Sequence, residues 1–209
     1  AVLLAEGAPP RLVGDPVLRH ERRPGEPSGG LSRSRPDVFR QANRHANALL
    51  VEAALDLLRP GGEAVLELFC GSGNFTGPLL ERAGSVAAVE AQGPALDLAR
   101  RDLEGAPPGR LRFFAGDALS LARALAREAA APRFGAALLD PPREGASGLG
   151  PVLRDLSVPR AVYVSCDPAT LARDLAGCAE AGFRVTAVQP VDMFPQTHHV
   201  EAVALLERQ

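Results

Sequence analysis

The sequence predicts an α/β protein with a mainly parallel sheet covered by helices on both faces. Short apolar runs alternate with helical patterns from residue 63 onward, and Gly, Pro or Asp residues bound most of these runs. The last two runs are separated by only a short polar turn. Because a parallel crossover needs about a dozen residues or more, these two strands must be antiparallel.

The elements follow in order from a first helical pattern that begins at Val38 and ends at Pro60-Gly61-Gly62. The later strands are predicted at 63–69, 85–90, 111–115, 134–140, 160–165, 183–191 and 198–206. The helices between them are predicted near 75–83, 93–104, 118–130, 147–156 and 168–181. A seven-stranded, mainly parallel sheet that ends in an antiparallel hairpin is the architecture of Rossmann-like class I methyltransferases and is unlike the usual nicotinamide domain.

Composition indicates one domain preceded by a segment of different character. The chain has 209 residues and a net charge of −2, which gives no overall electrostatic signal for nucleic acid, although eight arginines make the first fifth locally basic. Residues 1–36 are rich in Pro, Gly and Arg and are predicted to be irregular, as the remnant of a missing N-terminal or central region. Residues 37–209 form the predicted catalytic domain.

Three cysteines, Cys70, Cys166 and Cys178, lie far apart and form no C-x-x-C motif. This spacing suggests neither a disulfide framework nor a zinc or iron–sulfur site, and it fits a reducing cytoplasm. The pair His198-His199 near Glu201 has no evident third ligand group, so no metal site is predicted. The sequence has no apolar stretch of membrane-spanning length and gives no signal for an oligomeric state.

The first predicted strand leads into a glycine-rich turn, "ELFCGSGNFTG" at 67–77. Gly71 and Gly73 allow a tight turn and close approach of a ligand to the backbone. Glu90 and Asp117 end the next two strands, at the edge where open α/β sheets bind ligands. Glu90 can accept both ribose hydroxyls of a nucleoside cofactor. Asp117 can accept from an adenine amino group, or it can simply cap the following helix.

Two further strand ends carry reactive side chains. The fourth strand ends in "LLDPPREG", which directs Asp140 into the cleft and adds the guanidinium of Arg143. The fifth ends at Cys166, before an Asp167-Pro168 helix start. A helix N-terminus lowers the pKa of a nearby thiol, so Cys166 is a candidate nucleophile, and its alternative role is that of a small packed side chain.

Five motifs in one order, "FRQAN", "ELFCGSGNF", "LLDPPREG", "VYVSCDPATLARD" and "DMFPQTHHVE", resemble the SAM-dependent RNA 5-methyluridine methyltransferases, in particular the bacterial 23S rRNA branch. The resemblance implies S-adenosyl-L-methionine (SAM) as cofactor and RNA as substrate, favouring rRNA over tRNA. It implies Cys166 as nucleophile and Glu201 as base. It further implies a SAM site of Gln41, Phe69, Asn74, Glu90, Asp117 and Asp140, and an RNA-side pocket with Phe39 and Arg143.

The chain departs from that family in two respects. Asp167 stands where the family usually has Asn, which places a negative charge beside the thiol, and residues 1–36 are not expected to form the N-terminal OB-like RNA-binding domain of the family. Because of these departures, the alternative is that the chain is a SAM- or RNA-binding module without turnover. An NAD-dependent oxidoreductase would leave Cys166 and Glu201 without a role. RNA 5-methylcytosine enzymes usually carry a cysteine in the fourth-strand loop, which here reads Asp140-Pro-Pro-Arg.

Overall fold

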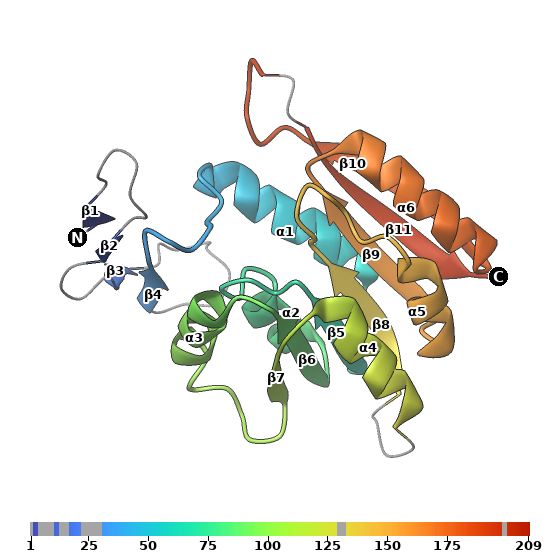
Figure 1. Ribbon diagram of the computed structural model, residues 1–209, viewed down its shortest axis with the longest axis horizontal. Helices are drawn as coiled ribbons and strands as arrows, with labels where there is room; N and C mark the ends of the chain where they lie inside the picture. The colour runs from blue at the N-terminus through green and yellow to red at the C-terminus, as the bar shows by residue number, and fades with distance from the viewer. Residues whose placement is uncertain (1, 4–10, 13–16, 22–30, 129–132, 198–199) are drawn as a thin grey trace.

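The computed structural model describes residues 2–3, 11–12, 17–21, 31–128, 133–197 and 200–209. Its centre is a seven-stranded sheet in the order β10-β11-β9-β8-β5-β6-β7 (Figure 1). The strands are β5 (Ala64–Leu68), β6 (Ser85–Glu90), β7 (Leu111–Ala115), β8 (Phe134–Leu139), β9 (Arg160–Ser165), β10 (Phe183–Val191) and β11 (Glu201–Arg208). Strands β7, β6, β5, β8 and β9 are parallel, and β11 is antiparallel to both β9 and β10. The predicted antiparallel C-terminal pair is confirmed.

Two helical layers cover the sheet. The helices are α1 (Arg44–Leu58), α2 (Thr76–Arg82), α3 (Gly93–Asp102), α4 (Ala118–Arg127), α5 (Leu149–Asp155) and α6 (Pro168–Glu180). One buried cluster joins α1, α2 and Leu96 of α3 to one face of the sheet, and a second joins α4, α5 and α6 to the other (Figure 1). Neighbouring residues of β5, Val65 and Leu66, belong to opposite clusters because side chains alternate along a strand.

The first helix is shorter than its sequence pattern predicts. It begins at Arg44 and not at Val38, because Asn43 adopts an extended conformation and its side chain accepts a hydrogen bond from the Ala46 N–H at 3.1 Å. An Asn at this position satisfies a helix N–H that otherwise lacks a partner. Residues 38–41 therefore lie outside the helix, and they line the site described below.

The last strand also begins later than predicted, at Glu201 and not at residue 198. His198 and His199 lie outside the described residues. Within the described ranges, we find no group of three His, Cys, Asp or Glu side chains arranged to hold a metal. No described helix combines the length and apolar character needed to cross a bilayer.

Short antiparallel pairs precede the sheet, β1 (Val2–Leu3) with β2 (Arg11–Leu12) and β3 (Leu18–Glu21) with β4 (Leu31–Ser34). Arg33 of β4 fastens this region to the end of α3. Its N–H and guanidinium each donate to the Asp102 carboxylate at 3.0 Å, and the guanidinium also donates to the Arg101 carbonyl. The Asp102 side chain is almost fully buried, so this contact fixes β4 beside the sheet.

Candidate cofactor and nucleophile site

A cavity of about 880 Å³ lies at the carboxyl edge of the parallel strands. Its walls come from the segment before α1, the glycine-rich turn after β5, the end of β6, the loop after β8, the end of β9 and the start of β11. The predicted site residues in its lining are Phe39, Gln41, Phe69, Asn74, Glu90, Asp140, Arg143, Cys166 and Glu201. The fold thus brings together side chains that are far apart in sequence, as expected where parallel strands end at a common edge.

The glycine-rich turn has the backbone conformation predicted for it. Gly71 and Gly73 have positive φ angles of 55° and 91°, which residues with a side chain rarely adopt. Phe69 adopts φ 62°, which is uncommon for a bulky residue and marks a backbone held by its surroundings. The turn therefore presents its backbone to the cavity at a position where larger residues would be strained.

Glu90 organises this turn directly. One carboxylate oxygen accepts from the Gly71 N–H at 2.8 Å, and the other accepts from the Gln92 N–H at 2.7 Å. Each oxygen of a carboxylate can accept a further hydrogen bond, so Glu90 still has acceptor capacity for hydroxyls. Its carboxylate both shapes the cavity wall and faces the ligand space.

Asp117, among the predicted site residues that the structure describes, is the one outside the cavity lining. It is exposed and caps α4, accepting from the Ser120 N–H at 2.8 Å. Hydrogen bonding by the side chain and by the backbone N–H of Ser120 lowers the pKa of Asp117. The capping alternative from the sequence is therefore present in the structure, and a role in cofactor binding stays a prediction.

Acidic side chains crowd the middle of the site. Burial raises the pKa of Glu67 on β5 to about 8, an effect that the Thr76 hydroxyl partly opposes and that Asp140 and Glu90 reinforce. Burial, together with the nearby Glu201, raises the pKa of Asp140 to about 7. Burial also raises the pKa of Glu201. Like charges in a poorly hydrated site favour proton uptake, or the arrival of a cation.

The thiol of Cys166 differs from the sequence prediction. Its pKa is raised and not lowered, because burial disfavours the thiolate and Glu201 adds a like charge. Arg143 acts in the opposite direction, and Asp140 adds a smaller upward shift. The partial charge of the α6 N-terminus is thus outweighed by loss of hydration and by a neighbouring carboxylate.

Asp167, the residue that departs from the family pattern, forms a complete N-cap. Its carboxylate accepts from the Ala169 and Thr170 N–H groups at 3.0 and 2.9 Å, and these bonds lower the pKa of Asp167. Ser165 braces the same turn, because its hydroxyl donates to the Asp167 carbonyl and accepts from the Asp167 N–H. The carboxylate is therefore engaged with the helix next to the thiol.

The other two cysteines are buried. Cys178 of α6 belongs to the buried core, and burial raises its pKa to about 12. Cys70 lies in the glycine-rich turn, where burial raises the thiol pKa even further and disfavours a nucleophilic role.

The residues that line the cavity fit a cationic nucleoside cofactor. The side-chain oxygen of Gln41, Oε1, is buried without a hydrogen-bond partner among the described residues, and it can accept from an ammonium group. Glu90 offers carboxylate acceptors for ribose hydroxyls. Asp140 and Glu201 offer negative charge for a positive group between them.

Sequence reasoning missed Asn47. Its side-chain amide exchanges two hydrogen bonds with that of Asn74, at 2.8 and 3.0 Å, and both residues line the cavity. Asn47 follows the cap residue Asn43 by four positions, so both lie on one face of α1. The side-chain amide of Asn43 donates a hydrogen bond to the Met193 carbonyl at 3.1 Å. In the sequence, the two asparagines four residues apart could have indicated that Asn47 has a role near the start of the helix.

These features define a Rossmann-like methyltransferase domain with a cysteine in its cofactor cavity. The chain belongs to the tRNA (uracil-5-)-methyltransferase family, whose model matches residues 31–209. Membership of this family leaves an NAD-dependent oxidoreductase without support.

Several similar curated proteins are 23S rRNA methyltransferases. The 23S rRNA (uracil(1939)-C(5))-methyltransferase RlmD of Pseudomonas entomophila is 44% identical over 184 residues, which cover 87% of this chain and 40% of that protein. RlmD of Alkalilimnicola ehrlichii is 42% identical over 200 residues, covering 95% of this chain and 44% of that protein. The chain thus spans less than half the length of these curated relatives.

A solved structure with the same architecture is the tRNA (uracil-54, C5)-methyltransferase of Pyrococcus abyssi in complex with S-adenosyl-L-homocysteine. It has 29% sequence identity and a TM-score of 0.73, over 94% of this chain and 45% of that one. The architecture and family together identify a SAM-dependent methyltransferase domain.

Proposed function

We propose that this chain is the catalytic part of an RNA methyltransferase that transfers a methyl group from SAM to C5 of a uridine, with 23S rRNA as the favoured RNA. The observation that carries the proposal is the shared cavity, which is lined by Cys166 and Glu201 together with a glycine-rich turn organised by Glu90. The RlmD relatives support rRNA over tRNA as substrate, and an rRNA substrate supports a cytoplasmic location for the activity.

In this proposal SAM is held by the residues of the predicted cofactor set. Glu90 accepts from the ribose hydroxyls, Gln41 accepts through its unpartnered oxygen, and Asn74 is held in place by Asn47. Phe69 and Asp140 complete the set, and Asp117 joins it only if the adenine extends to the start of α4. Bound SAM supplies an electrophilic methyl group.

The residues around the uracil perform the remaining chemistry. C5 of uracil is a poor nucleophile, so the Cys166 thiolate adds to C6 and generates an enolate with electron density at C5. After methyl transfer, the carboxylate of Glu201 takes the proton from C5. The C6–S bond then breaks, and the thiolate leaves as the double bond of the base is restored. The raised pKa of Glu201 suits a base that works near neutral pH.

The RNA side of the site lies at the cavity rim. Phe39 is 76% exposed there, although an aromatic ring of this size is usually buried, and Arg143 is exposed on the facing loop. An exposed ring can stack on a base, and a guanidinium can bind phosphate. Because C6 of a stacked base is inaccessible, the target uridine must be flipped out or lie in a loop. We assign residues 37–209 to this catalytic unit and residues 1–36 to the region that precedes it.

The test is incubation of the purified chain with labelled SAM and unmodified 23S rRNA or tRNA, followed by nucleoside analysis. We expect 5-methyluridine in the rRNA, and a covalent adduct with RNA that contains 5-fluorouridine, because fluorine blocks the final proton removal. Binding of SAM without any methyl transfer or adduct would instead support a binding module without turnover.

A further inference from the structure

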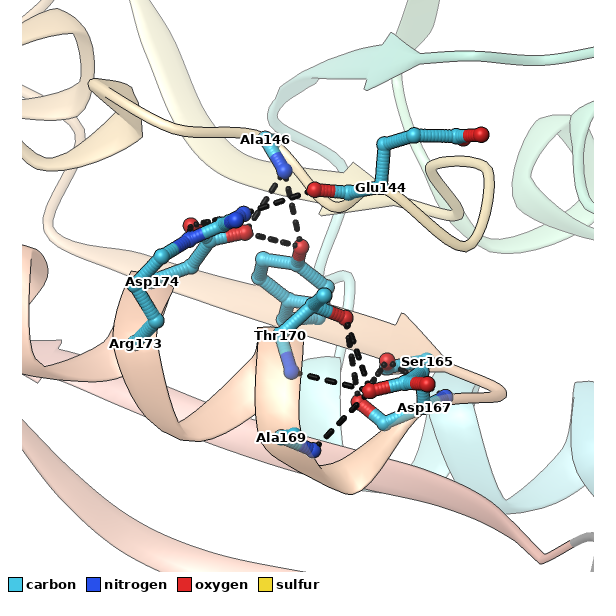
Figure 2. Close-up of polar contacts among 9 residues, drawn as sticks. Glu144, Ala146, Ser165, Asp167, Ala169, Thr170, Arg173 and Asp174 are labelled. Carbon is cyan, nitrogen blue, oxygen red and sulfur yellow. Dashed lines mark hydrogen bonds and ion pairs between the residues drawn. The ribbon is translucent and has the colours of Figure 1, made fainter.

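The loop after β8 is fastened to α6 by a polar network that neither the family match nor the cavity explains. Figure 2 shows Arg173 and Asp174 of α6 facing Glu144 and Ala146 of the loop. The Asp174 carboxylate accepts from the Ala146 N–H at 2.6 Å and from the Tyr163 hydroxyl at 2.7 Å. The Ala146 N–H also reaches the Tyr163 oxygen at 3.1 Å.

Arg173 completes this network from the solvent side. Its guanidinium contacts the second Asp174 oxygen at 2.8 to 2.9 Å and donates to the Glu144 carbonyl at 2.7 Å. Only 1% of the Asp174 side chain is exposed, whereas the Arg173 side chain is half exposed. A buried carboxylate is stable only when its oxygens are partnered, so movement of the loop away from α6 would remove hydrogen bonds that Asp174 requires.

The backbone of the loop is adapted to this contact. Gly145 adopts φ 76°, and a Cβ at this position would collide with the Asp174 carboxylate and the Arg173 guanidinium. The Gly145 N–H donates to the Pro142 carbonyl at 2.8 Å and closes a turn over residues 142–145. Arg143 lies within that turn. The end of the turn is therefore fixed to α6 at Glu144 and Ala146.

The same helix starts beside the thiol. Cys166 lies two residues before Pro168, the first residue of α6, and Tyr163 lies on β9, three residues before Cys166. We propose that Tyr163, Arg173 and Asp174 form a loop clamp, which holds the 140–146 loop on α6 and so sets the position of Arg143 relative to the Cys166 thiol. These three residues are positioning residues. The proposal rests on the proposed function in one respect, which is that the Cys166 thiol acts as the nucleophile.

The clamp has a consequence for thiol ionisation. The charged groups that share the cavity with the thiol or adjoin it in sequence are Arg33, Arg40, Arg44, Glu90, Asp102, Asp140, Arg143, Asp167 and Glu201. Of these, Glu201 and Asp140 raise the pKa of Cys166 and Arg143 lowers it. A loosened loop would leave Glu201 in place on β11, and Asp140 would stay at the β8 end of the loop, because its N–H donates to the Leu68 carbonyl at 3.4 Å. The effect of Arg143 would be weakened. The thiolate fraction would then fall.

The chain offers a matched control for this test. Arg154 and Asp155 of α5 form the same kind of ion pair between sequence neighbours on a helix, at 3.2 Å, and both are about half exposed. The contact between the Arg154 guanidinium and the Asp155 carboxylate is not part of the clamp. The variant Arg173→Gln removes the bridge to Glu144, and Arg154→Gln removes a similar surface charge elsewhere. Gln is a good helix former, so both variants should fold.

The experiment measures alkylation of Cys166 by iodoacetamide as a function of pH, with peptide mass spectrometry to separate it from Cys70 and Cys178. In Arg173→Gln we expect the apparent pKa of Cys166 to rise by about half a unit, so that alkylation at about pH 7.5 is about threefold slower than in the wild type. Arg154→Gln should match the wild type.

Tyr163→Phe serves as a second variant, because it removes one hydroxyl from the clamp and keeps the ring that fills the core. We expect a smaller shift of the thiol profile in the same direction. Thermal midpoints are recorded for every variant. Unchanged thiol profiles in Arg173→Gln and Tyr163→Phe, with or without lower midpoints, would overturn the proposal and leave the network a structural one. Alkylation requires neither RNA nor SAM, so this outcome is independent of methyl transfer.

Discussion

The two halves of the cavity are built on different principles. In the cofactor half, formed by the glycine-rich turn and Glu90, polar groups are paired: Glu90 accepts two backbone N–H bonds, and Asn47 and Asn74 satisfy each other. In the nucleophile half, formed by Asp140, Cys166 and Glu201, burial raises the pKa of every one of these three groups, and the like charge of Glu201 raises the pKa of Asp140 and of Cys166 further. The cofactor half therefore has its hydrogen bonds formed before a ligand binds. The nucleophile half has buried acidic groups whose charge is not balanced until a ligand binds.

This difference indicates how the site divides its work. Fixed hydrogen bonds give the cofactor half its shape, so the cost of ordering it is met during folding. The nucleophile half holds excess negative potential, which a sulfonium cofactor and a cationic neighbour such as Arg143 can relieve. Changes in the nucleophile half should therefore affect chemistry, and changes in the cofactor half should affect binding.

The largest effect is expected for Cys166→Ala. Removal of the nucleophile should reduce methyl transfer to uridine by more than about 10³-fold, because no other described thiol is exposed to the cavity in an ionisable state. SAM binding, followed by calorimetry, should be retained. Full activity in this variant would exclude the covalent mechanism.

The next largest effect is expected for Glu201→Gln. An amide of the same size cannot take the C5 proton, and turnover should fall by about 10² to 10⁴-fold. The covalent RNA adduct should accumulate, which denaturing electrophoresis with labelled RNA detects. Loss of activity without any adduct would assign Glu201 to an earlier step.

A binding effect is expected for Glu90→Ala. This change leaves the Gly71 and Gln92 N–H groups without their acceptor, at a cost of about 1 to 3 kcal/mol each where they are buried. SAM affinity measured by calorimetry should fall by about tenfold or more. The matched control is Asp117→Asn, which keeps the cap of α4; a similar loss of affinity in that variant would show that the cofactor reaches Asp117.

A smaller effect is expected from pH on stability. Asp140 has an ordinary pKa of 3.8 and a folded pKa of about 7, so between these values the folded chain keeps a proton that the unfolded chain has lost. Stability should therefore decrease as pH rises through this window, by on the order of 1 kcal/mol per unit for each such group. Thermal midpoints between about pH 5 and 8 measure this slope.

Asp140→Asn should make that slope shallower, and SAM should do the same in the wild type, because a cation compensates the ionised carboxylates. Glu67, with a pKa of about 8, contributes a remaining slope in the same direction. A slope that is identical in Asp140→Asn and the wild type would show that Asp140 ionises normally in the folded protein.

The smallest effect is expected for Asp167→Asn, which restores the residue usual in the family. Asn and Asp are similar N-caps, so the thermal midpoint should change little. Because the Asp167 carboxylate is engaged with the Ala169 and Thr170 N–H groups, the alkylation profile of Cys166 should also change little. A large gain in methyl transfer would show that the charge of Asp167 acts on the thiol.

Some features of the site could be read directly from local sequence. Gly71 and Gly73 follow an apolar run, and their positive φ angles agree with that pattern. The cap at Asp167 was evident from the Asp-Pro start of a helix, and it formed as expected. These are short-range effects, which depend on a few neighbouring residues.

Other features depended on distant segments. The start of α1 at Arg44 was misjudged because a helical pattern alone did not reveal the Asn43 cap, whose amide also contacts Met193. The pKa of Cys166 was predicted in the wrong direction because the helix N-terminus was visible in sequence, whereas burial and the approach of Glu201 from β11 were not.

The alternation of strands and helices, the antiparallel end of the sheet and the residues at most strand ends were predictable from the amino-acid sequence, because side-chain periodicity and turn chemistry are local. Only the tertiary structure decided the insertion of β11 between β9 and β10, the pairing of Asn47 with Asn74, and the loop clamp on Asp174. These depend on packing between segments that are remote along the chain. Hydration and charge at the thiol follow from that packing, so its ionisation is a property of the fold.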